Sequence, residues 1–262
     1  MSPSGSEPVV AVDVGNSRFK LGMFDRDAGE AYPQPSSLLE LHPDPWKGEP
    51  IIDWLNGCGV DRVSWWIASV HRGASQRIDA WLTDRRGDEG RTSLQHTNLP
   101  LSIDVEYPQD VGIDRLLAAV AVNAIRRPDR PALVVDHGSA ITVDLVDSNG
   151  VFRGGAILPG IGMAAGALDR LTDRLPLVDV HGLDQPDALG RSTEAAIRSG
   201  LFWGAVGAVR ELIERLSRQV PEEPQIVVTG GAGRHIAEAL GDEARWEPNL
   251  ILSGIALAAR EM

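Results

Sequence analysis

The sequence predicts an α/β fold built from two similar halves, and two stretches that lie far apart in the chain carry this prediction. The first stretch runs from Val9 to Phe24 and the second from Leu133 to Asp144. Each begins with an apolar, β-branched run typical of a buried strand, continues through an aspartate into a glycine-containing turn, and ends in another strand. A pattern repeated at this long spacing indicates a duplicated domain with a cleft between the copies.

The first stretch has the features of a phosphate-binding hairpin. Asp13 ends the first expected strand, Gly15-Asn16-Ser17 form a tight turn, and Phe19 to Phe24 form the second strand. Such a turn exposes backbone N–H groups to a polyphosphate, and an adjacent carboxylate can hold Mg²⁺ through water. Lys20 adds a positive charge for phosphate oxygens. An ordinary polar hairpin would contain similar residues. Phosphate binding is favoured because the same pattern recurs in the second half of the chain, where Asp136 occupies the position of Asp13.

The composition excludes several classes of partner. The 262-residue chain has a formal net charge of −12, which would repel nucleic acids and anionic membranes. Its single cysteine, Cys58, rules out an internal disulfide and a cysteine-rich metal site, so a reducing, cytoplasmic location is expected. No apolar run reaches the ~18 residues of a membrane span. Residues 1–8 lack the basic and apolar regions of a signal peptide and are expected to form a disordered tail.

The remaining helices and strands follow from local patterns. A basic link with prolines, Arg126–Pro131, predicts the boundary between an N-terminal half, 9–127, and a C-terminal half, 128–262. Further strands are expected at 63–70 and 102–107, with a short helix or strand at 37–41. Residues 154–163 are expected to form a glycine-dense strand and loop, and 225–233 a strand that runs into a glycine turn. Helices are expected at 51–58, 75–86, after residue 115, at 163–171, at 194–218, from 234, and at 255–260.

Three further stretches are candidates for binding or catalysis, and each has an ordinary structural alternative. Asp114 and Arg115 begin an expected buried helix, where the aspartate is either a helix cap or a carboxylate held in a cleft beside an arginine. The glycines between Gly154 and Gly162 allow close approach to a ligand or simply form a tight turn. The turn Thr229-Gly230-Gly231 can bind a nucleotide through its backbone, although such turns are common in α/β proteins. Glycines 200, 204 and 207 predict close packing of a long helix against another element of the chain or a second subunit.

Five motifs in the same order resemble those of the type III pantothenate kinases. They are DVGNSRFK at 13–20, GIDR at 112–115, DHGSAITVD at 136–144, GGAILPG at 154–160 and VTGGAG at 228–233. The resemblance covers nearly the whole chain from Val9. It implies two ribonuclease-H-like halves of the actin-like ATPase type, with ATP in the cleft between them. It also implies ATP-dependent phosphorylation of pantothenate to 4'-phosphopantothenate, the first step of coenzyme A biosynthesis, by a homodimer.

The resemblance also assigns roles to individual residues. Asp114 would be the general base for the pantothenate hydroxyl, and Asp136 would bind a monovalent cation, K⁺ or NH₄⁺. Mg²⁺ would accompany ATP. The ATP-binding residues would be Asp13, Val14, Gly15, Asn16, Ser17, Arg18, Phe19, Lys20, Ser139, Thr229, Gly230 and Gly231. The pantothenate-binding residues would be Tyr107, Gly112, Ile113, Asp114, Arg115 and Thr193.

Two departures from the family pattern concern the candidate site. Family members typically read DAGTA or DCGTA where this chain reads DHGSA, so His137 is larger than usual while Ser139 keeps the hydroxyl group. The substrate tyrosine that often precedes the GIDR-type glycine by seven residues is Val105 here, and Tyr107 follows two residues later. Two alternatives therefore stay open at this point: a kinase of another small alcohol or acid on the same fold, and a non-catalytic regulator that keeps the fold.

Overall fold

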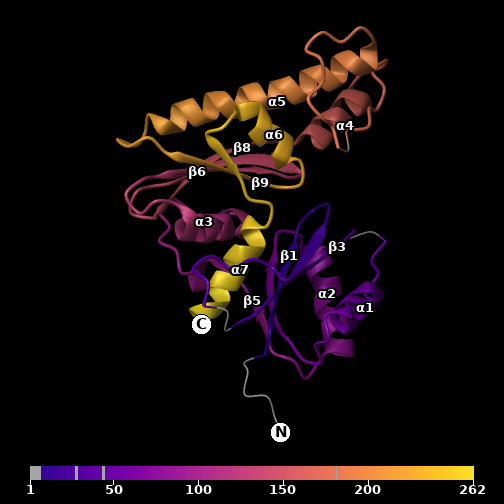
Figure 1. Ribbon diagram of the computed structural model, residues 1–262. Coiled ribbons are helices and arrows are strands. Elements are labelled where there is room, and N and C mark those ends of the chain that lie inside the picture. Colours follow the sequence, from indigo (N-terminus) through magenta and orange to yellow (C-terminus); the bar gives the residue numbers. More distant parts are fainter. Residues whose placement is uncertain (1–6, 27–28, 43–44, 181) are drawn as a thin grey trace. The chain divides into compact units, whose positions relative to one another are not determined.

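The computed structural model describes residues 7–26, 29–42, 45–180 and 182–262 (Figure 1). The chain forms two compact units. The first comprises residues 1–101, 106–125 and 249–262, and the second comprises residues 102–105 and 126–248. Most of the predicted disordered tail, residues 1–6, lies outside the described residues. The boundary predicted near residue 127 separates the two sheets, whereas the C-terminal helix packs with the first unit. The halves 9–127 and 128–262 stay predictions, and so does the nucleotide cleft between them.

The first unit contains a five-stranded sheet in the order β3-β2-β1-β4-β5. The first three strands form an antiparallel meander, and β4 and β5 continue the sheet in parallel with β1. The Val9–Phe24 hairpin predicted from the sequence is confirmed as β1 and β2. The strand bounds are β1 Val9–Val14, β2 Phe19–Phe24, β3 Ser37–Leu41, β4 Ser64–Ser69 and β5 Arg91–Ser93.

Helices cover both faces of this first sheet. Helices α1 (Glu49–Gly57) and α2 (Arg72–Arg85) pack on one face, where Val12 and Trp65 belong to the same buried core as Ile51 and Ile78. Helices α3 (Ile113–Ile125) and α7 (Leu250–Arg260) pack against each other, and α7 also contacts β1 on the opposite face. The helices α3 and α7 approach closely at Gly254 because this residue has no side chain. A Cβ atom there would overlap the carbonyl of Leu117.

The second unit repeats the connectivity of the first. Its sheet has the order β10-β9-β6-β7-β8, in which β6, β7 and β8 form the antiparallel meander and β9 and β10 continue in parallel with β6. Equal connectivity in both units confirms the predicted duplicated α/β fold. The strand bounds are β6 Ala132–His137, β7 Ala140–Val146, β8 Phe152–Pro159, β9 Gln225–Thr229 and β10 Ala244–Trp246.

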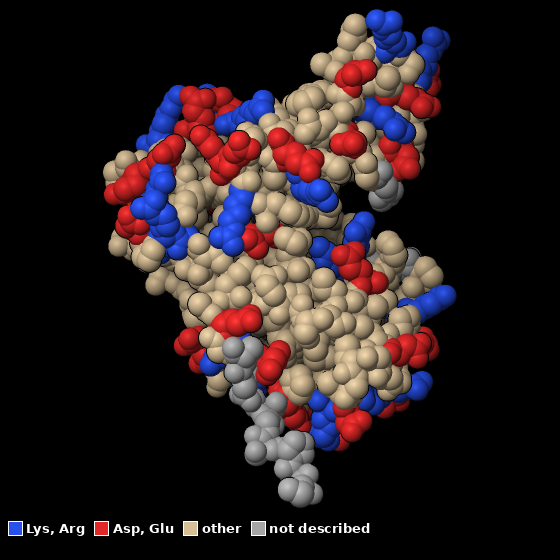
Figure 2. Space-filling model, in the orientation of Figure 1, with Lys and Arg blue, Asp and Glu red and all other residues tan. Residues whose placement is uncertain are grey.

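Three helices complete the second unit: α4 (Ile161–Leu171), α5 (Thr193–Ser217) and α6 (Gly233–Leu240). The long helix α5 lies along one face of the sheet (Figure 1), and the core beneath it joins Val209 to Leu133 and Val135. The solvent-facing side of α5 carries pairs four residues apart, such as Arg215 with Glu211, and Figure 2 shows acidic and basic side chains interspersed over this part of the surface.

The structure corrects several sequence predictions. The strand expected at 102–107 is only an isolated bridge between Ile103 and Phe152, while the three-residue strands β5 and β10 were not predicted. Helix α7 begins at Leu250, five residues before the expected start. A Cβ atom on Gly200, Gly204 or Gly207 would meet nothing within 4 Å, so no close packing within the described chain explains these glycines. None of the helices in the described ranges is long and apolar enough to span a membrane.

Candidate active site on the two units

A row of charged residues crosses the sheet of the first unit near the turn of the Val9–Phe24 hairpin. Asp13 on β1, Lys20 on β2 and Glu40 on β3 are direct cross-strand neighbours, so their side chains share one face of the sheet. The Lys20 ammonium nitrogen lies 4.0 Å from Glu40 Oε1, and Arg18 Nη1 lies 3.1 Å from Glu40 Oε2. The expected phosphate-binding cations are therefore both held beside Glu40, a neighbour that the sequence reasoning did not identify.

The turn itself is closed by a hydrogen bond from the Gly15 N–H to the Arg18 carbonyl, 3.0 Å long. Asn16, Ser17 and Arg18 are exposed, whereas Val14 and Phe19 are fully buried in the core beneath the hairpin. Val14 and Phe19 thus anchor the hairpin through their side chains, and only their backbones are available to a ligand. The exposed part of the hairpin consists of polar side chains and backbone amides, as phosphate binding requires.

The structure places Asp114 near this hairpin, within the first unit. It lies in the first turn of α3, and its Oδ1 accepts a 2.8 Å hydrogen bond from the Arg115 N–H. A Cβ atom on Gly112 would lie 2.5 Å from Asp114 Oδ1 and 3.8 Å from Val70 Cγ1. The N–H of Val70 donates to the carbonyl of Val14, 3.1 Å away. This chain of contacts puts Asp114 at the carboxyl ends of β1 and β4.

Asp13 and Asp114 therefore both lie at the carboxyl-terminal end of β1 and β4 in the first sheet. Val12 and Val14 point into the core under α1 and α2, so Asp13 between them faces the opposite side, which α3 and α7 cover. Both carboxylates are half-buried. Two carboxylates at one edge, one on a strand and one on a helix, are suited to holding a hydrated cation and to accepting a proton.

The other predicted substrate-site residues of the first unit differ in exposure. Gly112, Ile113 and Arg115 are half-buried beside Asp114. Tyr107 is 55% exposed and precedes a short 3₁₀ helix, Pro108–Asp110. Val105, at the position of the usual tyrosine, belongs to the second unit, where its Cγ1 would lie 3.4 Å from a Cβ on Gly154. Tyr107 is thus the exposed tyrosine available on the first unit.

In the second unit, Asp136 stands among oxygen-bearing neighbours at the end of β6. Thr142 on β7 and Thr229 on β9 are its direct cross-strand partners, so all three side chains share one face of the sheet. Gly230 has a φ of +91°, and a Cβ atom there would overlap the Asp136 carboxylate. The carboxylate and two hydroxyl groups form a donor set suited to a hard cation. Thr142 was missed from sequence, although its position opposite Asp136 in the hairpin is the signal that identifies it.

The turn that contains Ser139 is packed closely against the end of β8. The N–H of Gly160 donates to the Ser139 carbonyl at 3.1 Å, and a Cβ atom on Gly160 would lie 2.6 Å from the Gly138 carbonyl. Gly160 also precedes α4, whose first N–H groups therefore begin beside this turn. This close approach of backbone to backbone explains the last glycine of the GGAILPG stretch, Gly160.

His137 points away from Asp136 into the interior. It is 3% exposed, and no described residue gives either ring nitrogen a hydrogen bond. Burial lowers the pKa of His137 to about 4, so the ring is neutral at physiological pH. The residue that distinguishes DHGSA from the family pattern is thus a buried neighbour of the candidate site and not one of its ligand-facing groups.

Thr193 is exposed at the first turn of α5. The preceding Ser192 is the N-cap, and its hydroxyl oxygen accepts a 3.2 Å hydrogen bond from the Ala195 N–H. Because Ser192 supplies the cap, the Thr193 hydroxyl is not needed to complete the helix terminus. It is available for a ligand, as the sequence prediction requires.

Comparison with known proteins settles the family. The model of the type III pantothenate kinase family matches residues 9–215. The chain belongs to this family. A type III pantothenate kinase from Chlorobaculum parvum is 34% identical over 259 residues, covering 96% of this chain and 94% of its own length. Another, from Rhodopirellula baltica, is 40% identical over 195 residues, or 72% of this chain and 69% of that protein.

Solved structures agree on the fold alone. The activator of the 2-hydroxyisocaproyl-CoA dehydratase from Clostridium difficile has a TM-score of 0.56 at 14% identity, covering 97% of this chain and 94% of that chain. The ethanolamine utilization protein EutJ from Carboxydothermus hydrogenoformans has a TM-score of 0.54 at 15% identity, covering 98% of this chain and 91% of that chain. Together with the repeated strand order, they confirm the actin-like, duplicated fold class predicted from the sequence.

Proposed function

We propose that this protein catalyses the ATP-dependent phosphorylation of pantothenate to 4'-phosphopantothenate, the first step of coenzyme A biosynthesis. Membership of the type III pantothenate kinase family supports the reaction. The observation that carries the mechanism is the position of Asp114 at the same end of the first sheet as the Val9–Phe24 hairpin. A carboxylate next to a phosphate-binding turn is where a kinase needs the group that accepts the proton of its acceptor alcohol.

The hairpin of the first unit would bind the phosphates of ATP. The backbone of the turn supplies hydrogen-bond donors, and Asp13 would hold Mg²⁺ through water. The chemistry that Mg²⁺ would supply there is partial neutralisation of the charge on the transferred phosphoryl group. Lys20 would turn from Glu40, 4.0 Å away, towards the phosphate oxygens when the nucleotide is present. Since Glu40 is half-exposed, this exchange of partners costs little electrostatic energy.

Asp114 would act as the general base. Its half-buried carboxylate would orient the primary alcohol of pantothenate and accept its proton as the phosphoryl group transfers in line. Gly112, Ile113 and Arg115 would line the acceptor site beside it. Thr193 and Tyr107 would supply hydroxyl groups from exposed positions, Tyr107 in place of the tyrosine that is absent at Val105.

The second unit would contribute a cation site and contacts to the nucleotide. Asp136, flanked by Thr142 and Thr229, would bind a monovalent cation, K⁺ or NH₄⁺, because the donor set is entirely oxygen. Ser139 would contact the ATP phosphates. Gly230 and Gly231 would let the adenosine approach the backbone, which a side chain would prevent.

The protein would act as a homodimer in a reducing cytoplasm. Several large apolar side chains of the second unit are exposed, and a partner subunit would cover such a surface. They are Met163, Leu171, Leu177 and Leu189, which are between 51% and 83% exposed. Light scattering at several protein concentrations tests this part: a mass of twice the 28.2 kDa chain supports the dimer, and a monomer at micromolar concentration contradicts it.

A coupled assay for ADP tests the proposed reaction. Turnover is measured with Mg²⁺ and ATP, with and without pantothenate, in K⁺ buffer and in Na⁺ buffer. We expect ADP formation that depends on pantothenate and is faster in K⁺ than in Na⁺. Nucleotide binding without pantothenate-dependent turnover in either buffer would contradict the proposal that pantothenate is the substrate. Equal rates in K⁺ and Na⁺ would contradict only the cation site.

A further inference from the structure

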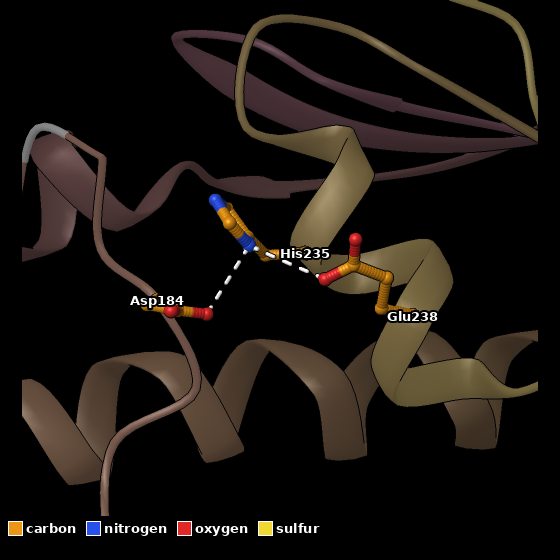
Figure 3. Close-up of side chains that lie close together, drawn as sticks. All are labelled: Asp184, His235 and Glu238. Carbon is orange, nitrogen blue, oxygen red and sulfur yellow. Dashed lines mark ion pairs between the residues drawn. The ribbon is translucent and has the colours of Figure 1, made fainter.

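A histidine and two carboxylates meet on the second unit outside the candidate active site. They are Asp184, in the segment before α5, and His235 and Glu238, both on α6 (Figure 3). His235 Nδ1 lies 3.4 Å from Asp184 Oδ1 and 3.5 Å from Glu238 Oε2. The three candidate ligand atoms all lie within 4.8 Å of one another. Among the described residues, this is the only such group of three metal-binding side chains.

We propose that Asp184, His235 and Glu238 bind one zinc-class divalent ion, with water as the fourth ligand. Imidazole nitrogen combined with carboxylate oxygens suits Zn²⁺, whereas Mg²⁺ and Ca²⁺ prefer oxygen alone. Two ligands bonded at about 2.1 Å to a tetrahedral ion lie roughly 3.4 Å apart. The two distances from His235 Nδ1 agree with that separation and exceed the length of a good N–H···O hydrogen bond.

His235 Nδ1 has a free coordination position. It is shielded from solvent, and no described residue gives it a hydrogen bond of acceptable geometry. A shielded imidazole nitrogen that faces two carboxylate oxygens without a hydrogen bond is suited to a metal ion, which would satisfy all three groups at once. Figure 3 shows the Asp184 and Glu238 carboxylates on either side of this nitrogen.

Neighbouring groups hold the two carboxylates in position. Asp184 Oδ1 accepts a 2.8 Å hydrogen bond from the Gln185 N–H, and Glu238 Oε1 accepts a 3.0 Å hydrogen bond from Arg234 Nε. The second oxygen of Glu238, Oε2, is the one that faces His235. Such supporting hydrogen bonds orient metal-binding side chains and increase their affinity.

Apolar packing brings the two elements together without the ion. Leu183, next to Asp184, and Ile236, next to His235, pack in one apolar cluster with Phe202 of α5. The segment is also fixed to α5 by a 2.9 Å hydrogen bond from Trp203 Nε1 to the Pro186 carbonyl. The cluster therefore presents Asp184 to α6 in advance, which lowers the entropic cost of ion binding.

The ion would connect two segments that lead to the candidate site. The segment of Asp184 continues through Gly190 to Thr193, and α6 begins directly after the Thr229-Gly230-Gly231 turn. A metal bond between them would stabilise the second unit without taking part in phosphoryl transfer. This inference does not depend on the proposed function, because its readouts are metal binding and the local protection of backbone amides from hydrogen exchange.

The test is a titration of nucleotide-free, metal-stripped protein with Zn²⁺ in competition with a chromogenic chelator. The full-length chain carries Cys58→Ser throughout, so that the free thiol does not bind Zn²⁺. We expect one tight equivalent per chain, and a drop in affinity of roughly 10- to 100-fold or more in His235→Gln and in Glu238→Gln. His42→Gln, which removes an exposed histidine of the first unit, is the matched control and should keep the tight equivalent.

Hydrogen exchange gives a second readout that does not involve activity. Zn²⁺ should slow amide exchange in 183–188 and in α6 of the parent protein, and should have no such effect in His235→Gln. Circular dichroism establishes that each variant is folded. Zn²⁺ binding only at millimolar concentration, or a tight equivalent that persists in folded His235→Gln, would overturn the proposal and leave an ordinary ion pair at this position.

Discussion

Gly230 lies directly against Asp136: a Cβ atom on residue 230 would overlap the Asp136 carboxylate and lie 2.5 Å from the carbonyl oxygen of His137. The φ of Gly230, +91°, is also one that other residues rarely adopt. The backbone of the VTGGAG turn is thereby fixed next to the carboxylate proposed to bind the monovalent cation. The backbone carbonyl of His137 cannot be moved aside as a flexible side-chain end could.

Gly230→Ala should therefore disturb both stability and the cation site. Strain at positive φ alone costs of order 1–3 kcal/mol, and the overlap with Asp136 adds to it. Gly241→Ala is the matched control, since Gly241 also has a positive φ, +102°, but a Cβ there would meet nothing within 4 Å. We expect Gly230→Ala to lower the unfolding midpoint more than the control and to raise the K⁺ concentration needed for half-maximal rate. Equal behaviour of the two variants would contradict a role for the Gly230–Asp136 contact.

Asp114→Asn should remove most of the turnover without removing nucleotide binding. Loss of a general base lowers kcat by roughly 10²–10⁴-fold, while the Val9–Phe24 hairpin proposed to bind ATP is unchanged. Asp110→Asn, an exposed carboxylate in the same segment, is the control and should turn over like the wild type. Steady-state kinetics and a separate nucleotide-binding measurement distinguish the two effects. A rate near that of the wild type in Asp114→Asn would remove this residue from the mechanism.

His137 should make the protein lose stability as the pH falls from about 6.5 towards 4. Burial lowers the pKa of His137 from 6.5 to about 4, so the unfolded chain binds more protons than the folded chain in this interval. The stability that the neutral His137 ring provides is fully present above its pKa in the unfolded chain, about 6.5. It is lost as the pH falls towards and through its pKa in the folded chain, about 4. The shift corresponds to a loss on the order of 3 kcal/mol.

Urea unfolding of the wild type and of His137→Phe at pH 7 and at pH 4 checks this linkage. Phenylalanine keeps an aromatic ring in the buried position and cannot titrate. The variant should lose less free energy of unfolding between the two pH values than the wild type. Equal losses would show that His137 is not protonated in this interval.

Glu89 should contribute strongly to the stability of the first unit. Its buried carboxylate accepts a 2.7 Å hydrogen bond from Trp65 Nε1 and a 3.2 Å hydrogen bond from the Val63 N–H, and Arg86 Nη2 lies 2.6 Å from it. Glu89→Ala would leave an indole N–H, a backbone N–H and a partly buried guanidinium without their acceptor, and such losses typically cost about 3–5 kcal/mol.

Thermal and urea unfolding measure this effect, with Asp88→Ala as the neighbouring control. Asp88 is exposed, and its ion pair with Arg62 is screened by solvent, so its loss should change the midpoint little. Glu89→Gln keeps one oxygen acceptor and should lie between Glu89→Ala and the wild type. A Glu89→Ala protein as stable as the Asp88→Ala protein would contradict the account.

Local sequence patterns predicted the two hairpins because each combines a β-branched run with a turn that contains glycine and small polar residues, which are typical of tight turns. The three-residue strands β5 and β10 carry no such pattern, since an edge strand of that length is defined by pairing with β4 or β9. The segment 102–107 shows the opposite case: its alternating residues look like a strand, yet only Ile103 finds a partner. Pairing is a tertiary property, and strand propensity does not determine it.

The candidate site shows the same limit. Asp13, Asp114 and Asp136 could be identified because each ends a strand or begins a helix inside a motif. The proximity of Lys20 to Glu40 and the burial of Glu89 could not, because they depend on which strands are neighbours and on which side chains the core encloses. Glu89, in the short segment between α2 and β5, is a buried acceptor that only the folded structure identifies.

The most direct test of the central claim is to identify the reaction product by mass spectrometry and phosphorus NMR after incubation with Mg²⁺, ATP and pantothenate in K⁺ buffer. We predict pantothenate that carries one phosphoryl group on its primary alcohol, formed by the wild type and by Asp110→Asn and nearly absent with Asp114→Asn. Unmodified pantothenate in the presence of folded, nucleotide-binding wild-type protein, or equal product from Asp114→Asn, would contradict the account.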